Sequence, residues 1–317
     1  MTLLRADLHV HTSHSKHNAD IPFVASRDCY SAPQAVYRIA KARGMDLVAI
    51  TDHDTMDGAL ELLDRRPGAT DVIVGEEVSC RFPDAEIQVH LGVYGMTEAL
   101  HRDVQPLRDN VFEAAAFLRE AGVFFSLNHL FHFYRRQVPV ERYLRLLHEV
   151  PALETRNGAM LAAHNRLVEQ IAAAWSVRSP LASVAGSDAH TLRRVGRTWT
   201  EAPGKTREEY LESLRRGLGR PGGRHGGAPA TCGDVYGVIA SYAASLVGAG
   251  PADHRGWHRA ACLAFVAASL PLQLLLPAVM TLLIKRREMR EVRRARTDLH
   301  AVFGRRSEAP LLTERET

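Results

Sequence analysis

Residues 4–11 read LRADLHVH, a short apolar run that ends in His9 and His11. Further runs of strand length follow up to residue 217, and helix-like stretches such as 32–43 and 106–121 lie between them. Alternation of this kind is typical of strand and helix units around a parallel sheet or barrel. The strands that we expect are 3–10, 46–51, 71–74, 86–94, 123–127, 152–155 and 181–185.

Imidazole and carboxylate side chains stand at the ends of these runs. Besides His9 and His11, they are Asp52, His53, Asp54, Glu76, Glu77, His90, His129, Asp188 and His190. In a parallel barrel the C-terminal ends of the strands converge on one rim, so we expect these side chains to meet. Buried histidines and carboxylates are costly without a partner, and several divalent cations would provide one. Mixed imidazole and carboxylate ligation favours manganese, zinc or iron.

The composition narrows the class of protein. The 317 residues are 46% hydrophobic and 24% charged, which is ordinary for a globular chain. Residues 285–317 contain ten Lys/Arg and six Asp/Glu, whereas residues 1–284 contain thirty of each. A neutral body carries no strong nucleic-acid signal, because that function needs clustered cations. Four cysteines without a C-x-x-C pair, and a start without a signal-peptide pattern, lead us to expect a cytoplasmic protein.

Six motifs in order resemble those of a known family. They read DLHVHTSHSKH, ITDHDTMDGA, GEEVS, VHLGVYG, NHLFH and GSDAH, and they lie within residues 3–200. Together they resemble the PHP family, the polymerase and histidinol phosphatase superfamily of metal-dependent phosphoesterases. The resemblance implies an α/β fold, a distorted (β/α)7 barrel with a trinuclear metal centre at its C-terminal rim.

The resemblance also implies nine ligands for up to three divalent ions. The first ion would be held by His9, His11, Glu77 and Asp188. The second would be held by Glu77, His90 and His129. The third would be held by His17, His53 and His190. Glu77 is taken as the bridging ligand in place of Glu76, because it has the family's G-x-E spacing from Gly75.

The activity implied by the resemblance is hydrolysis of a phosphoester by hydroxide that the metal centre activates. The candidate catalytic residues are Glu77, Asp188 and His190, and His190 is also a candidate proton donor. Asp7 or Asp52 would orient a ligand histidine. A phosphate needs cationic contacts beyond the metals. The candidates are Arg135, Arg136, Arg193, Arg194 and Arg197.

The chain changes character after the barrel region. A Gly/Pro-rich run, GLGRPGGRHGGAP at 217–229, marks a linker at 218–231 between a barrel at 1–217 and a C-terminal region at 232–317. Residues 235–252 and 260–284 carry no charge, and a basic tail starts at Lys285. Two interpretations stay open. The apolar segments form a hairpin that contacts lipid and anchors the protein to the inner face of a membrane, or they pack on the barrel or on a second subunit.

We therefore expect a hydrolase that acts on a small phosphorylated substrate. One alternative is a metal-dependent amidohydrolase with a carbamylated lysine, but none of Lys16, Lys41 and Lys205 ends an expected strand. Another is a non-catalytic module that binds a phosphorylated ligand, although such a module would not need nine ligands. The remaining helical histidines, His101, His148 and His164, are expected to face solvent.

Overall fold

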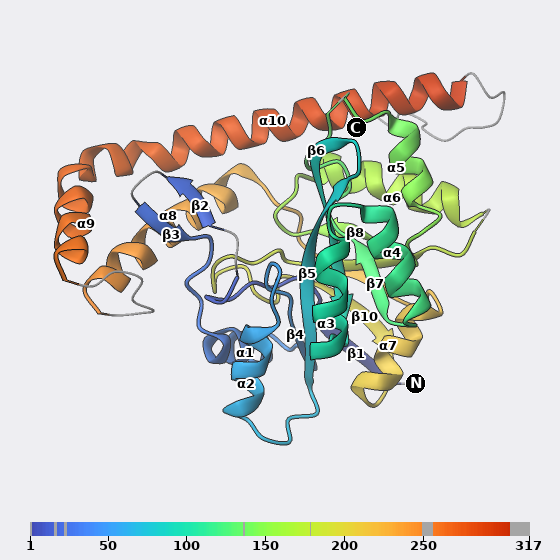
Figure 1. Ribbon diagram of the computed structural model, residues 1–317, viewed down its shortest axis with the longest axis horizontal. Helices are drawn as coiled ribbons and strands as arrows, with labels where there is room; N and C mark the ends of the chain where they lie inside the picture. Colours follow the sequence, from blue (N-terminus) through green and yellow to red (C-terminus); the bar gives the residue numbers. More distant parts are fainter. Residues whose placement is uncertain are drawn as a thin grey trace.

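The computed structural model describes residues 2–15, 18–21, 24–135, 137–177, 179–248 and 256–304. Nine strands form one sheet in the order β11-β10-β1-β4-β5-β6-β7-β8-β9, which curls into a nearly closed barrel (Figure 1). The strands are β1 (Leu3–Asp7), β4 (Leu47–Ile50), β5 (Val72–Phe82), β6 (Ala85–Tyr94), β7 (Phe124–Leu127), β8 (Ala152–Asn157), β9 (Ala182–Gly186), β10 (Thr198–Pro203) and β11 (Arg220–Gly223). A separate hairpin consists of β2 (Asn18–Ile21) and β3 (Val24–Arg27).

All seven expected strands are present, and the α/β barrel class is confirmed. The strand directions differ from a regular (β/α)7 barrel. β1, β4 and β5 are parallel, and so are β7, β8 and β9, but β6 runs antiparallel to both β5 and β7. Only residues 83–84 connect β5 to β6. A parallel crossover needs a dozen or more residues, so this short connection forces an antiparallel pair.

The barrel closes between β9 and the segment that follows β1. Val10 and Ala189 form a parallel bridge there, and the backbone amide of His11 donates to the carbonyl of Ala189 at 3.1 Å. Gly186 makes this approach possible, because a Cβ at its position would lie 2.2 Å from the Cβ of His9. The closure therefore places the residues after β1 directly beside the residues after β9.

Helices cover the outside of the sheet. They are α1 (Pro33–Ala42), α2 (Asp57–Asp64), α3 (Glu98–Val104), α4 (Val111–Glu120), α5 (Val140–Leu146), α6 (Ala162–Ser176) and α7 (Arg207–Arg215). The helix expected at 32–43 is α1. The helix expected at 106–121 is wrong at its start, because a 3-10 turn (Gln105–Leu107) precedes α4. Asn110 caps α4, since its side-chain oxygen accepts from the amide of Phe112 at 3.1 Å.

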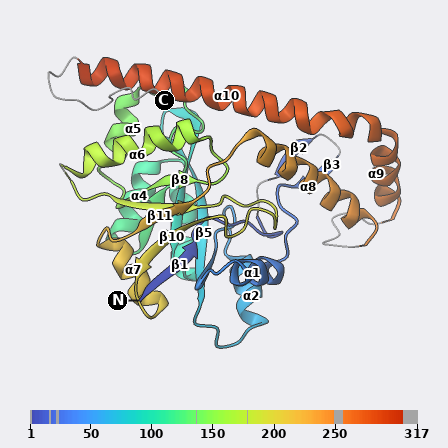
Figure 2. The same cartoon turned by 180° about the vertical axis from the view of Figure 1, so that it is seen from behind.

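The C-terminal region is helical, as α8 (Ala228–Leu246), α9 (Gly256–Ala268) and α10 (Leu270–Gly304). In Figures 1 and 2, α10 runs along one side of the barrel and extends beyond it toward α8 and α9. The Gly/Pro-rich run was expected to form no strand, but residues 220–223 form β11 and pair with β10. This is possible because β11 is an edge strand, where the missing amide of Pro221 costs little. The boundary between the barrel at 1–217 and the C-terminal region at 232–317 stays a prediction.

The apolar segments 235–252 and 260–284 map onto α8 and onto the α9–α10 pair. Within the described residues, no single helix is long and apolar enough to cross a membrane. α9 and α10 meet that criterion only as a pair, and they are bent by 74° at the break between them.

The second half of α10 packs on the barrel. Val292, Ala295 and Leu299 are buried in the main hydrophobic core. The hydroxyl of Tyr134 donates to Asp298 at 2.8 Å, and the Lys285 ammonium donates to the carbonyl of Ala159 at 2.8 Å. This half of the helix is therefore an integral part of the fold.

Candidate metal centre

Eight of the nine expected ligands lie in one buried cluster. His9 and His11 follow β1, His53 follows β4, and His129 follows β7. Two others lie within strands, Glu77 in β5 and His90 in β6, and the loop after β9 provides Asp188 and His190. His17 lies outside the described residues.

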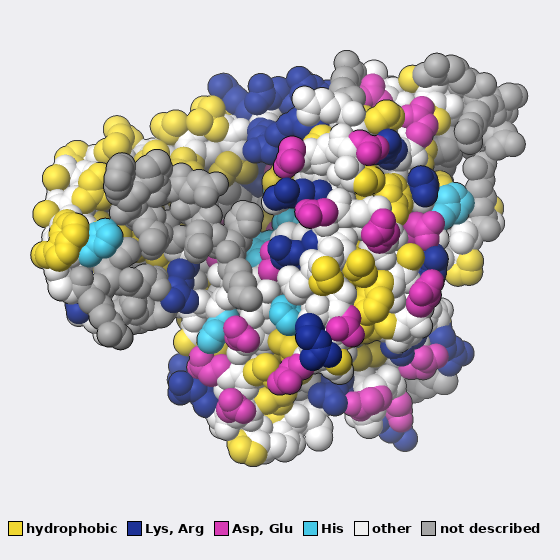
Figure 3. Space-filling model, in the orientation of Figure 1, with side chains coloured by type: hydrophobic (Ala, Val, Ile, Leu, Met, Phe, Trp, Pro, Cys, Tyr) yellow, Lys and Arg dark blue, Asp and Glu magenta, His cyan; other side chains and the backbone are white. Residues whose placement is uncertain are grey.

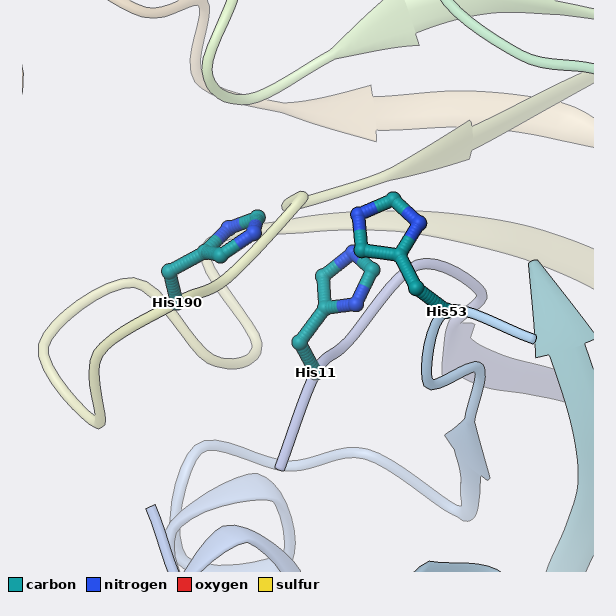
Figure 4. Close-up of side chains that lie close together, drawn as sticks. All are labelled: His11, His53 and His190. Atoms are coloured by element: carbon teal, nitrogen blue, oxygen red, sulfur yellow. The ribbon is translucent and has the colours of Figure 1, made fainter. Parts of the chain in front are cut away.

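The imidazole rings of three loops lie side by side (Figure 4). The ring centroid of His11 is 4.5 Å from that of His53 and 4.3 Å from that of His190. Their nitrogen atoms are close enough to share one metal ion. Residues that are up to 179 positions apart in the chain therefore meet at one place.

Glu77 is central to the cluster. One carboxylate oxygen, Oε2, lies 3.0 Å from Nε2 of His9, 3.4 Å from Nε2 of His11 and 3.2 Å from Nδ1 of His53. The other oxygen, Oε1, lies 3.3 Å from Nδ1 of His90 and 3.1 Å from Nε2 of His129. A carboxylate whose two oxygens face different groups of imidazoles can bridge two metal ions.

Four overlapping groups of side chains have the geometry to hold a metal ion. They are His9 with His11 and Glu77, His9 with His129 and Asp188, His53 with Glu77 and His90, and His11 with His53 and His190. Asp188 also stands beside the group of His9, His11 and Glu77, because its Oδ1 lies 3.6 Å from Nε2 of His9 and 3.5 Å from Nε2 of His11. The grouping differs from the expected one in placing His11 beside His53 and His190.

Asp28 is a candidate ligand that the sequence analysis did not identify. Its Oδ2 lies 3.4 Å from Nε2 of His190 and 3.9 Å from Nε2 of His53. Asp28 follows the β2–β3 hairpin, which returns the chain to the rim. Asp28 thus lies beside His53 and His190, where the family resemblance implied His17.

The donor set fits divalent cations. Within the described residues, Oε2 of Glu77 and both ring nitrogens of His90 are buried and have no hydrogen-bond partner. Such orphaned polar atoms are expensive unless an ion satisfies them. Burial would raise the pKa of Glu77, but the surrounding His9, His90 and His53 hold that pKa well below its usual value. Glu77 is therefore an anion that can bind a cation.

The imidazoles fall into two kinds according to the direction in which their pKa is shifted. Burial holds the pKa of His53 and of His90 below its usual value, which keeps these rings neutral, the form that binds metals. Burial also acts on His11, but the nearby carboxylates of Asp188 and Glu77 outweigh it and raise the pKa to about 10. Metal binding at His11 would therefore release a proton.

Glu154, in β8, fixes the orientation of two ligand candidates, His9 and His129, through hydrogen bonds. Its Oε1 accepts from Nδ1 of His9 at 2.9 Å, and its Oε2 accepts from the backbone amide of His129 at 3.0 Å. Asn157 donates to Glu154 at 2.8 Å and to Asp188 at 3.2 Å. A carboxylate on the far nitrogen of a metal-binding histidine fixes its tautomer and orientation. The sequence analysis did not single out Glu154, because it lies inside the expected strand 152–155 and not at the end of an apolar run.

The two aspartates expected to orient a histidine ring have a different role. Asp7 accepts from the backbone amides of Ser187 and Gly196 at 2.8 and 2.7 Å. Asp52 accepts from the hydroxyl of Thr12 at 2.7 Å. None of these three hydrogen bonds involves an imidazole ring. These carboxylates hold the loops that carry the ligands, because a short aspartate side chain at a strand end reaches the neighbouring backbone first.

Glu76 points away from the cluster, as alternation along a strand requires. Its carboxylate accepts from His101 at 2.6 Å and from Gln105 at 2.8 Å. His101 was expected to face solvent and is instead partly covered by this contact. His164, also expected at the surface, is buried and lies 2.6 Å from the carbonyl of Leu130.

Two ligand positions have left-handed backbone conformations. φ is 28° at His129 and 51° at Asp188. Residues other than glycine seldom adopt such angles, and they persist where the surrounding structure imposes them. The loops after β7 and β9 are thus shaped to turn these side chains inward.

The arginines expected to contact phosphate occupy different places. Arg135 pairs with Glu291 of α10, and Arg194 pairs with Asp234 of α8. Arg193 and Arg197 line a pocket of about 200 Å³, together with Arg224 and with Ser187, the residue before Asp188. Arg136 lies outside the described residues. Arg194 lines the same pocket, so the structure brings three of the expected arginines next to the loop that carries Asp188.

Comparisons with known proteins find partial matches to this chain. The family model described as PHP-associated matches residues 163–218. An uncharacterized protein of Methanocaldococcus jannaschii is 34% identical over 77 residues, which are 24% of this chain and 44% of that protein. The chain thus matches less than half the length of this relative.

Three solved structures are similar, all at low identity. PsfC from Pseudomonas syringae is 18% identical with a TM-score of 0.49, over 73% of this chain and 94% of that chain. A two-domain protein from Bacteroides vulgatus, containing a predicted PHP-like metal-dependent phosphoesterase, is 17% identical with a TM-score of 0.48, over 72% and 68%. A lesion-specific endonuclease from Pyrococcus furiosus is 18% identical with a TM-score of 0.46, over 69% and 57%.

The likeness to the PHP family rests on the sequence motifs and on the match to the family model over residues 163–218. The model covers α6, β9, β10 and α7, which include the loop with Asp188 and His190. The motifs before it supply the other candidate ligands of the cluster. The chain is thus similar to the PHP family in its ordered motifs and, over residues 163–218, in the matching family model.

Proposed function

We propose that this protein is a hydrolase, a metal-dependent phosphoesterase that cleaves a small phosphorylated substrate at a trinuclear centre. The observation that carries the proposal is the set of overlapping groups of buried imidazoles and carboxylates around Glu77. Bound divalent ions, of manganese, zinc or iron, would supply Lewis-acid activation of water and neutralise charge on the phosphoryl oxygens.

The side chains around the site have separable tasks in this proposal. Glu77 and Asp188 hold the positive charge, and Glu154 keeps His9 in position. His190 is the most exposed of the described ligand candidates, with 29% of its side chain accessible. We assign to it the proton that the leaving oxygen needs, because a proton donor must reach both substrate and solvent.

The arginine pocket supports a phosphorylated substrate. Four arginines, Arg193, Arg194, Arg197 and Arg224, line it, and Asp234 is the acid that lines it. Asp234 already pairs with Arg194. The pocket therefore keeps a net positive charge next to the loop that carries Asp188, where a second anionic group of the substrate would bind.

Phosphatase assays test the proposal. The purified full-length protein, loaded with Mn²⁺, should hydrolyse p-nitrophenyl phosphate and members of a panel of small phosphoesters. The double variant His9→Ala/His11→Ala should lose this activity. The matched control is His148→Ala/His300→Ala, which changes two exposed histidines and should keep it.

Three results would contradict the proposal. Turnover that persists in the His9/His11 variant would show that the cluster is not the active site. Stoichiometric binding of a phosphorylated ligand without turnover, under any of the three metals, would favour the non-catalytic module instead. Hydrolysis of amides but not of phosphoesters would identify an amidohydrolase.

A further inference from the structure

α9 and the first half of α10 expose an unusual amount of apolar side chain. Figure 3 shows hydrophobic side chains gathered over this end of the molecule. The exposed fractions include 79% for Trp257, 54% for Phe265, 61% for Leu272 and 67% for Leu275. Residues 260–284 contain no charged side chain. We call this surface, formed by residues 256–283, the apolar α9–α10 surface.

The exposed residues surround much of the helix. Between residues 270 and 283 they are Leu270, Leu272, Leu274, Leu275, Val279, Met280, Leu282 and Leu283. Successive residues of a helix are rotated by about 100°, so this set covers more than half of the circumference. α8 contacts the remaining side, where the hydroxyl of Tyr236 donates to the carbonyl of Leu274 at 2.6 Å. A protein partner typically covers one face of a helix, whereas lipid surrounds it.

Cations border this surface on the same helix. Arg286, Arg287, Arg290, Arg293 and Arg294 are exposed. The acids of this stretch, Glu288 and Glu291, are buried. Glu288 accepts from the amide of Leu161 at 2.5 Å, and Glu291 pairs with both Arg135 and Arg287. The exposed side of the helix is thus strongly positive. In Figure 3, basic side chains lie next to the hydrophobic ones.

We propose that the apolar α9–α10 surface docks on a bilayer that contains anionic lipids. The apolar residues would enter the hydrocarbon boundary, while the arginines contact the headgroups. α9 is about 20 Å long and residues 270–283 about 21 Å, both short of the ~30 Å hydrocarbon core, so the surface enters one leaflet and does not cross. A second copy of the chain fits less well, because two-fold docking would bring like charges together.

The proposal does not depend on the metal centre, and vesicle flotation tests it directly. The full-length protein should float with vesicles of phosphatidylcholine and phosphatidylglycerol (7:3) at physiological salt. Leu272→Gln/Leu275→Gln should lower the partition coefficient tenfold or more, because the two side chains lie far from the barrel core. The matched control is Val177→Gln/Leu218→Gln, at two exposed apolar residues of the barrel, and should leave it unchanged.

The charged border has its own test. Arg286→Gln/Arg290→Gln should lower binding to the anionic vesicles several-fold, reduce the salt dependence, and have little effect with pure phosphatidylcholine. Trp257 provides a readout in the unmodified protein. Brominated lipids should quench its fluorescence, and Trp257→Phe should remove the quenched component, since Trp175 and Trp199 are partly buried in the barrel.

Either of two results would overturn the proposal. One is a wild-type protein that stays at the bottom of the gradient with both kinds of vesicle. If light scattering then finds a dimer that Leu272→Gln/Leu275→Gln dissociates, the surface is a subunit interface. The other is flotation of the leucine variant equal to that of the wild type.

Discussion

The metal centre and the apolar α9–α10 surface depart from the usual distribution of side chains in opposite directions. At the centre, ionisable groups are buried, with His9 0% and Glu77 1% exposed. At the surface, Leu275 is 67% exposed. Each arrangement costs free energy in the isolated chain, since polar groups lose water and apolar groups keep it. The comparison teaches that the chain by itself compensates neither arrangement, and our two proposals assign cations to the first region and lipid to the second.

The strongest test of this comparison is at Glu77. Glu77→Gln removes the charge that bridges the imidazole groups, so we expect turnover to fall by about 10³-fold or more. Glu76→Gln is the matched control, because Glu76 lies on the opposite face of β5 and binds His101 and Gln105. Its activity should stay within a few-fold of the wild type. Rates with Mn²⁺ and metal content by mass spectrometry measure both, and equal losses in the two variants would contradict the bridging role.

Metal removal should destabilise the centre but not the apolar surface. A ligand at a thousand times its Kd stabilises a fold by about 4 kcal/mol, so chelation should lower the melting temperature by about 10 °C. The Glu77→Gln protein should show a much smaller shift. Calorimetry with and without chelator measures the difference. A melting temperature that does not respond to chelation in the wild type would mean that the buried cluster is stable without cations.

The two halves of α10 provide a matched pair of substitutions. Leu299→Ala removes a buried side chain from the main core and should cost about 2–5 kcal/mol of unfolding free energy. Leu275→Ala removes an exposed one and should cost less than about 0.5 kcal/mol in solution. Urea denaturation without lipid compares them. A large loss in Leu275→Ala would show that the first half of α10 is covered in solution.

The smallest expected effect concerns the support of the ligands. Glu154→Gln keeps the shape of the side chain but loses the charge behind Nδ1 of His9, so metal affinity should fall by about 10- to 100-fold. Metal titration by calorimetry measures it, and excess Mn²⁺ should restore turnover. Activity that stays low at saturating metal would instead give Glu154 a role beyond positioning.

Much of the architecture was predictable from the sequence, because strands and ligands share a local pattern. Apolar runs marked all seven expected strands, and the family's G-x-E spacing selected Glu77 in place of Glu76, which the structure places on the opposite face of β5. β10 and β11 were missed because TWTEAP and RPGG lack an apolar run. Asp28 was missed because the β2–β3 hairpin separates it from the first histidines.

The predictions about arginines and isolated histidines were less informative. Nothing local distinguishes Arg135, which pairs with Glu291, from Arg193 beside the pocket, since their partners lie on other elements. His164 sits in a helical stretch with a polar pattern, yet it is buried against Leu130. Long-range packing decides such contacts, and it leaves no trace in the neighbouring residues.

The sequence by itself determined the chemistry of this protein: the kinds of ligand, their positions after apolar runs, and an uncharged segment that is too apolar for an ordinary surface. The tertiary structure alone decided which ligand candidates lie close enough to share an ion, that Glu154 holds His9, and that the second half of α10 packs on the barrel. The reason is physical. Local side-chain pattern sets backbone periodicity and solvation, whereas closure of the barrel brings together groups that the chain separates by more than a hundred residues.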